Sequence, residues 1–187
     1  MRFSRQFRGF WRLRFWTLSA VSFTVGIGLT PVNALPGVGE KAPAFSLTDF
    51  NNKTFSLSTE LKNNNAILLW FTNLCEGCQA SLPELEKIRN RYEKNRILVI
   101  AVSQLGKDRK TVENIIRENK LAMGFLFDPA GKATEQFSGK YQPGTCPLKN
   151  IFLIGKDRKI AFISHYPGID ESEITDQLNK MIEIHRN

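Results

Sequence analysis

Two of the chain's three cysteines, Cys75 and Cys78, lie two residues apart in the segment FTNLCEGCQASLPEL. Thiols at this spacing can form a redox couple, in which one sulfur attacks a disulfide of another molecule and the second sulfur releases the mixed disulfide. The same pair also allows a peroxide-reducing thiol, half of a metal site or a structural disulfide. The rest of the sequence supports these four kinds of chemistry to different degrees.

The pair stands at the junction of two predicted elements. The preceding segment AILLWFT, residues 66–72, is short and continuously apolar, which is typical of a buried central strand. The segment after the pair predicts a helix, with a kink at Pro83. Its apolar side chains recur at helical spacing, at Leu82, Leu85, Ile88 and Tyr92. Cys75 is therefore expected where a strand gives way to a helix.

A helix N-terminus favours a reactive cysteine. Its free N–H groups and its dipole stabilise an anion, and the anion available here is a thiolate. We expect Cys75 to be the exposed attacking thiol and Cys78, one turn later, the more buried resolving thiol. A purely structural disulfide has less support, because a two-residue loop constrains the unfolded chain very little.

A metal site has few candidate ligands in this sequence. Structural zinc sites use about four ligands, and outside the pair the cysteines and histidines are Cys146, His165 and His185. We therefore expect no resident metal and no other cofactor. If copper were bound, Cys75, Cys78 and His165 would be the least implausible ligands.

The other segments predict a mixed α/β protein. The final helix is expected to begin with a capping box from Asp170 to Glu173. Alternating or continuous apolar runs and helical spacing predict, in order, a hairpin at 44–58, a strand at 96–104, a helix at 108–120, a strand at 124–128, a short helix at 129–137 and a hairpin at 150–165. This order indicates a mixed central sheet with helices on both faces.

The positive charge of the chain is concentrated at its N-terminus. The formal net charge is +8, but five arginines and no acidic residue lie in residues 1–34. The remaining chain has 21 basic and 18 acidic residues, so we expect no nucleic-acid partner. Its length suits a single domain over residues 35–187.

Residues 1–34 have the pattern of a signal peptide or a membrane anchor. A basic run precedes an apolar stretch at residues 15–32, and small residues lead up to Ala34. Such a segment engages the membrane and directs the rest of the chain out of the cytoplasm, either secreted or anchored. An extracytoplasmic Cys-x-x-Cys pair is oxidised unless something reduces it.

The segment AILLWFTNLCEGCQASLPELEKI resembles the active-site strand and helix of thioredoxin-like proteins of the redoxin (AhpC/TSA-type) superfamily, above all the exported TlpA-like thiol-disulfide oxidoreductases. GEKAPAFSLTD, FLFDPAGKATEQF and IFLIGKDRKI resemble other parts of the same superfamily, from residue 37 to about residue 182. The resemblance implies a thioredoxin-like fold with an added N-terminal hairpin. It also implies disulfide exchange with client proteins, with a membrane electron donor as a second partner.

The resemblance further implies a cis-proline opposite the pair, just before the strand that matches IFLI. Pro147 is the expected residue and Pro143 the alternative. Cys146 directly precedes Pro147. If Pro147 has this role, the sulfur of Cys146 faces Cys75 and Cys78, so Cys146 and Pro147 are both expected to bind substrate. Cys146 could then trap a mixed disulfide, switch the couple or complete a three-sulfur metal site. Its other interpretation is a small apolar residue in a loop.

Two features separate this chain from the family pattern and keep an alternative open. The positions where TlpA-like proteins carry a proton-shuttling carboxylate are Leu69 and Ser81. Thr72 lies three residues before Cys75, as in the peroxidatic motif of peroxiredoxins, but Lys149 stands at the position of the peroxide-orienting arginine and cannot make its two-pronged contact. A peroxiredoxin-like peroxidase is the alternative function, and a copper-binding or redox-sensing module is a further one.

Overall fold

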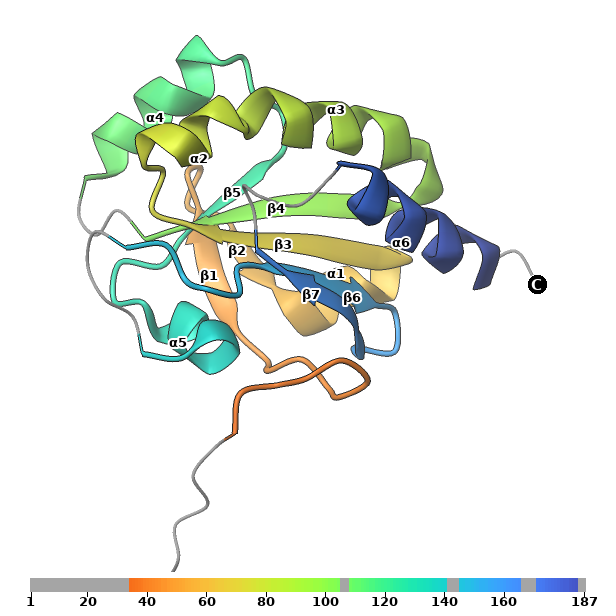
Figure 1. Ribbon diagram of the computed structural model, residues 1–187. Helices are drawn as coiled ribbons and strands as arrows, with labels where there is room; N and C mark the ends of the chain where they lie inside the picture. Colours follow the sequence, from red (N-terminus) through yellow and green to blue (C-terminus); the bar gives the residue numbers. More distant parts are fainter. Residues whose placement is uncertain (1–33, 105–107, 141–144, 166–170, 185–187) are drawn as a thin grey trace, which may run out of the picture. The chain divides into compact units, whose positions relative to one another are not determined.

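A computed structural model describes residues 34–104, 108–140, 145–165 and 171–184 (Figure 1). The strands in these residues are β1 (Ser46–Asp49), β2 (Thr54–Ser56), β3 (Ala66–Thr72), β4 (Ile97–Ser103), β5 (Gly124–Phe127), β6 (Ile151–Gly155) and β7 (Ile160–Ser164). The helices are α1 (Leu57–Asn63), α2 (Glu76–Ala80), α3 (Leu82–Tyr92), α4 (Arg109–Glu118), α5 (Lys132–Ser138) and α6 (Glu171–Ile184), with a short 3-10 turn η1 (Glu93–Asn95).

The strands form one mixed sheet in the order β2-β1-β5-β4-β3-β6-β7. The three central strands β3, β4 and β5 are parallel, whereas β1, β2, β6 and β7 run antiparallel to their neighbours. Every residue of β3 is buried, as its apolar sequence predicts. The predicted fold class, with its N-terminal hairpin β1–β2, is confirmed.

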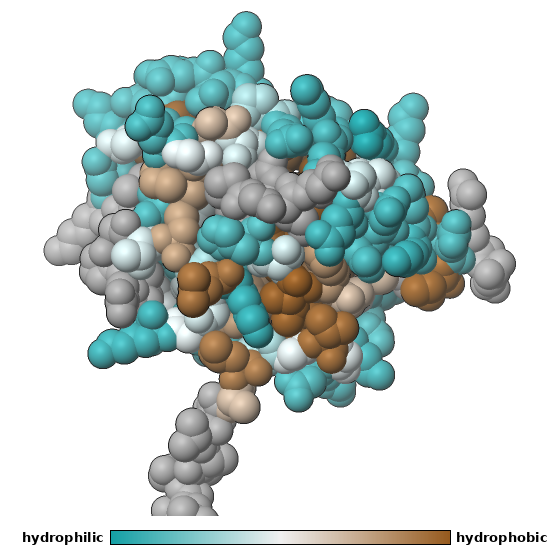
Figure 2. Space-filling model, viewed as in Figure 1, coloured by the Kyte–Doolittle hydropathy of each residue, from teal (hydrophilic) through white to brown (hydrophobic). Residues whose placement is uncertain are grey.

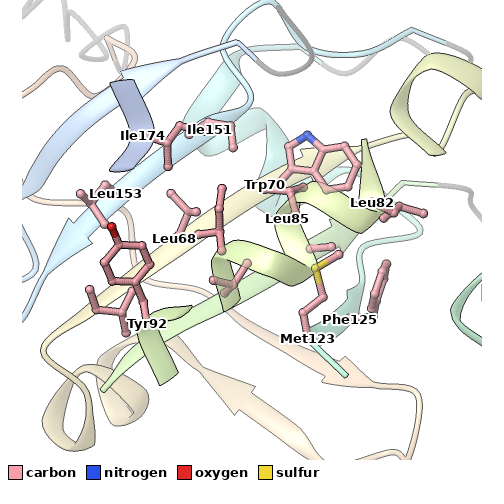
Figure 3. Close-up of a cluster of buried hydrophobic side chains, with 14 of the residues drawn as sticks. Leu68, Trp70, Leu82, Leu85, Tyr92, Met123, Phe125, Ile151, Leu153 and Ile174 are labelled. Carbon is pink, nitrogen blue, oxygen red and sulfur yellow. The ribbon is translucent and has the colours of Figure 1, made fainter. Parts of the chain in front are cut away.

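Alternate residues of β3 face opposite sides of the sheet, because side chains alternate along a strand. Leu68 and Trp70 belong to a cluster with α3, α4 and α6, whereas Leu69 and Phe71 belong to a second cluster with α1 and α5. Figure 1 shows α3 and α4 on one side of the sheet and α1 and α5 on the other. Figure 3 shows Leu68 and Trp70 among side chains of the first cluster, including Leu85. Helices on both faces were predicted, and this prediction is confirmed.

Two local predictions were wrong or incomplete. The second half of the expected hairpin does not continue to residue 58, because β2 ends at Ser56 and α1 begins at once, burying Leu57 and Leu61. The expected kink at Pro83 is a break between α2 and α3 at Ser81, with Pro83 in the first turn of α3. Proline suits a first turn, since its missing N–H is not needed there.

Two further sequence-based expectations concern the ends of the chain. Asp170 of the expected capping box lies outside the described residues, whereas the helix itself is present as α6, with Ile174 and Leu178 buried. In the part of the chain that the structure describes, no helix is long and apolar enough to span a membrane. The expected apolar stretch at 15–32 lies outside that part.

Candidate active site

Buried polar residues gather at one edge of the sheet. Hydrogen bonds join the ends of neighbouring elements there: Gln104 N–H donates to Thr72 C=O at 3.0 Å, and Phe71 N–H donates to Asn150 C=O at 2.8 Å. The buried polar side chains at this edge, which we call the polar edge, are Thr72, Asn73, Ser103, Gln104, Asp128 and Asn150. The carboxyl ends of β3, β4 and β5 meet at this edge, which is where ligands bind in open α/β sheets.

The turn from β3 to α2 is held by its own side chains. Leu74 has a left-handed backbone with φ of 53°. Its N–H donates to Thr72 Oγ1 at 2.9 Å, and its C=O accepts from Gln79 Nε2 at 2.8 Å. Asn73 Oδ1 accepts from the N–H of Cys75 at 3.0 Å. These bonds stabilise a conformation that a non-glycine residue rarely adopts, and they fix the position of Cys75.

Cys75 and Cys78 occupy the positions that the sequence predicts. Cys75 is the N-cap of α2 and is exposed, whereas Cys78 lies in the first turn of helix and is completely buried. Their sulfur atoms are 3.2 Å apart, and both thiols are free. The expected contrast between an exposed and a buried sulfur is confirmed; their roles as attacker and resolver stay predictions.

Cys146 brings a third sulfur to the pair. Its Sγ lies 3.1 Å from Sγ of Cys78 and 4.0 Å from Sγ of Cys75. It also lies 2.9 Å from Oδ1 of Asn73. Cys146 is partly buried, and it also packs against the apolar cluster that contains Trp70.

The contact between Cys78 and Cys146 moves their two pKa values in opposite directions. The hydrogen bond from the Cys78 thiol is the largest influence on Cys146; together with the Asn73 backbone N–H and the charge of His165, it outweighs burial and lowers the pKa of Cys146 to about 6. The same bond, reinforced by burial, raises the pKa of Cys78, and the Thr72 hydroxyl opposes this rise.

The Asn73 carboxamide acts against the ionisation of Cys146. The N–H of Cys75 fixes Asn73 Oδ1 as an acceptor, so the 2.9 Å contact with Cys146 Sγ favours a protonated thiol. We nevertheless assign the thiolate to Cys146 rather than to Cys78, because Cys78 is the more deeply buried sulfur and donates to its neighbour. Burial disfavours a charge on Cys78, and the Thr72 hydroxyl offsets this only in part.

The other residues named from sequence lie around this group or away from it. Pro147 follows Cys146, and its carbonyl oxygen is 3.1 Å from Nδ1 of His165. That Pro147 is the cis-proline stays a prediction, and Pro143 lies outside the described residues. Leu69 faces the second apolar cluster, and Ser81 Oγ donates to a backbone carbonyl.

Sequence reasoning did not single out Asn73. Its side chain contacts Cys75, Cys78 and Cys146, and therefore links all three cysteines. A signal was present, because asparagine in a turn often accepts a hydrogen bond from the N–H two residues later. Only the fold shows that the same oxygen also reaches Cys146.

The three sulfurs are also the group best placed to hold a metal ion. Among the described residues, Cys75, Cys78 and Cys146 form a set whose ligand atoms all lie within 4.8 Å of one another. His165 is not part of this set, so the copper ligands that the sequence suggested are not the ones that the structure assembles.

Comparison with known proteins places this chain in a family. Residues 38–163 match the AhpC/TSA family. Among curated proteins, the chain is similar to the thiol-disulfide oxidoreductase ResA of Halalkalibacterium halodurans, with 22% identity over 88% of this chain and 93% of that protein. It is also similar to ResA of Oceanobacillus iheyensis, with 24% identity over 71% of this chain and 70% of that protein.

Solved structures share the fold at low sequence identity. A putative thiol:disulfide interchange protein DsbE from Chlorobium tepidum has a TM-score of 0.67 and 20% identity, covering 79% of this chain and 99% of that one. Peroxidoxin BcpB from Mycobacterium tuberculosis has a TM-score of 0.65 and 18% identity, covering 81% of this chain and 99% of that one. With the family match extending over most of the described residues, the chain belongs to the AhpC/TSA family.

Proposed function

We propose that this protein is a thiol-disulfide oxidoreductase that exchanges disulfides with client proteins through Cys75 and Cys78. The observation that carries the proposal is the exposed sulfur of Cys75, 3.2 Å from the buried sulfur of Cys78, at the start of a helix. The exposed sulfur can reach a disulfide in another protein, and the buried sulfur can reach only its neighbours. The similarity to two curated ResA proteins supports the same chemistry.

In the reducing direction, the Cys75 thiolate attacks one sulfur of a client disulfide. A mixed disulfide forms, and the other client sulfur leaves as a thiolate. Cys78 then attacks the Cys75 sulfur, which forms the Cys75–Cys78 disulfide and releases the second client sulfur. Both electrons pass to the client, and the opposite direction reverses each step.

The second step requires Cys78 to lose its proton, although its pKa is raised. TlpA-like proteins are expected to use a carboxylate for this, but Leu69 and Ser81 stand at the matching positions. In this chain the Cys146 sulfur, 3.1 Å away, accepts the hydrogen bond of the Cys78 thiol. We assign Cys146 as the group that positions and receives this proton.

Cys146 and Pro147 are proposed to contact the client polypeptide next to the pair. A hollow beside them is lined by Thr134, Ser138, Lys140 and Leu148 as well. Leu148, which also lines this hollow, is 89% exposed and offers an apolar side chain to a client. Figure 2 shows separate hydrophobic groups on the face that it displays, not one continuous apolar surface.

We also propose that residues 1–34 are a signal peptide or membrane anchor and that residues 35–187 act outside the cytoplasm. A reducing role there needs an electron supply, and a membrane electron donor is the partner that we propose. The pattern of five arginines followed by the apolar stretch 15–32 supports this assignment.

The peroxidase alternative has less support. In a peroxidatic site the hydroxyl of Thr72 would assist Cys75. Here that hydroxyl accepts the N–H of Leu74, and it acts on the pKa of Cys78. Lys149 is exposed, and its carbonyl oxygen accepts from Ser138 Oγ at 2.6 Å.

Reduction of insulin disulfides by the full-length protein tests the proposal. We expect activity in the wild type, loss of activity in Cys75→Ser, and a trapped mixed disulfide on Cys75 in Cys78→Ser. Cys146→Ser is expected to retain Cys75-dependent reduction at a lower rate. Rapid consumption of hydrogen peroxide that requires Cys75, without insulin reduction, would instead establish the peroxidase.

A further inference from the structure

We propose that the reduced protein binds one Cu(I) ion through the three thiolates of Cys75, Cys78 and Cys146. This binding goes beyond disulfide exchange, because it uses the same pair together with the third sulfur and moves no electron. The thiols that coordinate the ion release their protons to solvent, and copper stays in the +1 state throughout.

The three sulfurs form a compact triangle. Their separations are 3.1, 3.2 and 4.0 Å. Three sulfurs bound to one ion at about 2.3 Å, the length of a zinc–thiolate bond, stand about 3.8–4.0 Å apart. The longest side of the triangle already has this length, and the two sides at Cys78 reach it if they open by about 0.8 Å.

A triangle suits a shared ion better than a relay of disulfides. In thiol-disulfide exchange the attacking sulfur approaches along the axis of the bond that breaks, so the three sulfurs involved lie close to a line. Cys75, Cys78 and Cys146 instead surround a common point, since no two of their sulfurs are more than 4.0 Å apart.

The ligand set favours Cu(I) over Zn²⁺. Thiolates select soft ions, of which Cu(I) and zinc are the common ones. Zinc sites in proteins are almost always four-coordinate, and in the described residues no histidine, carboxylate or further cysteine joins the three sulfurs. Three ligands suffice for Cu(I), so the set is complete for copper and one protein ligand short of a closed, structural zinc site.

The surroundings allow the ion to enter and hold the ligands in place. Cys75 is exposed, so one side of the triangle faces solvent, whereas Cys78 is completely buried. The Asn73 backbone N–H contacts Cys146, and the Asn73 side-chain oxygen accepts from the Cys75 N–H, which fixes the turn that carries Cys75. Such outer contacts orient metal ligands. The arrangement supports tight but exchangeable binding.

Competition for Cu(I) tests the proposal on the purified full-length protein, reduced with a phosphine and handled without oxygen. A chromophoric Cu(I) chelator reports how much copper the protein withdraws. We expect one Cu(I) per chain in the wild type, at least about 100-fold weaker binding in Cys146→Ser, and no withdrawal by protein with an oxidised Cys75–Cys78 pair. Zn²⁺, tested alone with a zinc indicator, should not be retained at one ion per chain.

His165→Ala is the matched control, because His165 lies near Cys146 without belonging to the three-ligand set. It should bind Cu(I) within about 3-fold of the wild type. Wild-type affinity in Cys146→Ser, or a loss in His165→Ala that equals the loss in Cys146→Ser, would overturn the three-sulfur site. Insulin reduction by the metal-free samples is read separately, so a failure of copper binding is distinguished from a failure of the proposed function.

Discussion

Two parts of the same sheet differ sharply in chemistry. In the middle of β3, residues 67–71 are all apolar and completely buried, with alternate side chains packed on each face. Directly beyond, Thr72 and Asn73 begin the polar edge, whose buried side chains accept and donate specific hydrogen bonds. The side chains of the middle stabilise the fold through apolar burial, whereas those of the edge use hydrogen bonds to hold three sulfurs. Substitutions in the two parts should therefore have separable effects.

The largest effect is expected for Cys75→Ser. Reduction of insulin should fall by at least about 100-fold, because no thiolate remains to open the client disulfide. The exposed sulfur makes no contact on which folding depends, so the thermal midpoint should stay close to that of the wild type. Activity assays and thermal unfolding of the same sample check both statements. A variant that unfolds readily would mean that the polar edge also supports the fold.

Phe137→Ala should produce the opposite pattern. Phe137 is completely buried on the α5 face and packs against Phe45, Phe71 and Phe152, with ring centroids 5.1–5.8 Å apart. Its truncation should lower the free energy of unfolding by about 3–5 kcal/mol. The rate of alkylation of Cys75 in the folded variant should be unchanged. Urea unfolding measures the first effect; a changed alkylation rate would show that the two parts are coupled.

Removal of the donor to Cys146 should change its titration. In a metal-free Cys75→Ser background, Cys146 is expected to be alkylated with a midpoint near pH 6, since the hydrogen bond from Cys78 lowers its pKa to about 6. The thiolate reacts, so alkylation rises as the pH rises through the pKa. Cys78→Ala should move the midpoint upward, towards 9, and slow alkylation at pH 7 by about tenfold. Cys78→Ser, whose hydroxyl can still donate, should give a midpoint between those of the Cys75→Ser background and of Cys78→Ala. Equal midpoints in all three proteins would contradict the assignment of Cys78 as the donor.

The smallest effect is expected for Asn73→Ala. The variant leaves the N–H of Cys75 without its side-chain acceptor and should lower the free energy of unfolding by about 1–2 kcal/mol. Cu(I) binding should weaken at the same time, since the turn that positions Cys75 loses a hydrogen bond. Asn73→Asp keeps an acceptor oxygen and should retain most of the stability. If Asn73→Ala and Asn73→Asp lose the same stability, the hydrogen bond does not hold the turn.

The regular elements followed from local patterns. The apolar run at 66–72 coincides with β3, and the helical spacing of Leu82, Leu85, Ile88 and Tyr92 places their side chains in the core as expected. The missed helix α1 is only seven residues long, and it follows β2 without a turn. Short segments of this kind carry too few apolar positions to distinguish a strand from a helix.

The sequence by itself determined the reactive pair. Two residues between Cys75 and Cys78 bring their sulfurs together through local helix geometry, and a buried strand before them makes one exposed and the other buried. The family resemblance suggested that Cys146 faces the pair, but only the tertiary structure placed its sulfur there, 68 residues along the chain from Cys78. Because β6 pairs antiparallel with β3, the segment before β6 returns to the carboxyl end of β3. That pairing, which no local pattern encodes, turns a two-sulfur motif into a three-sulfur site.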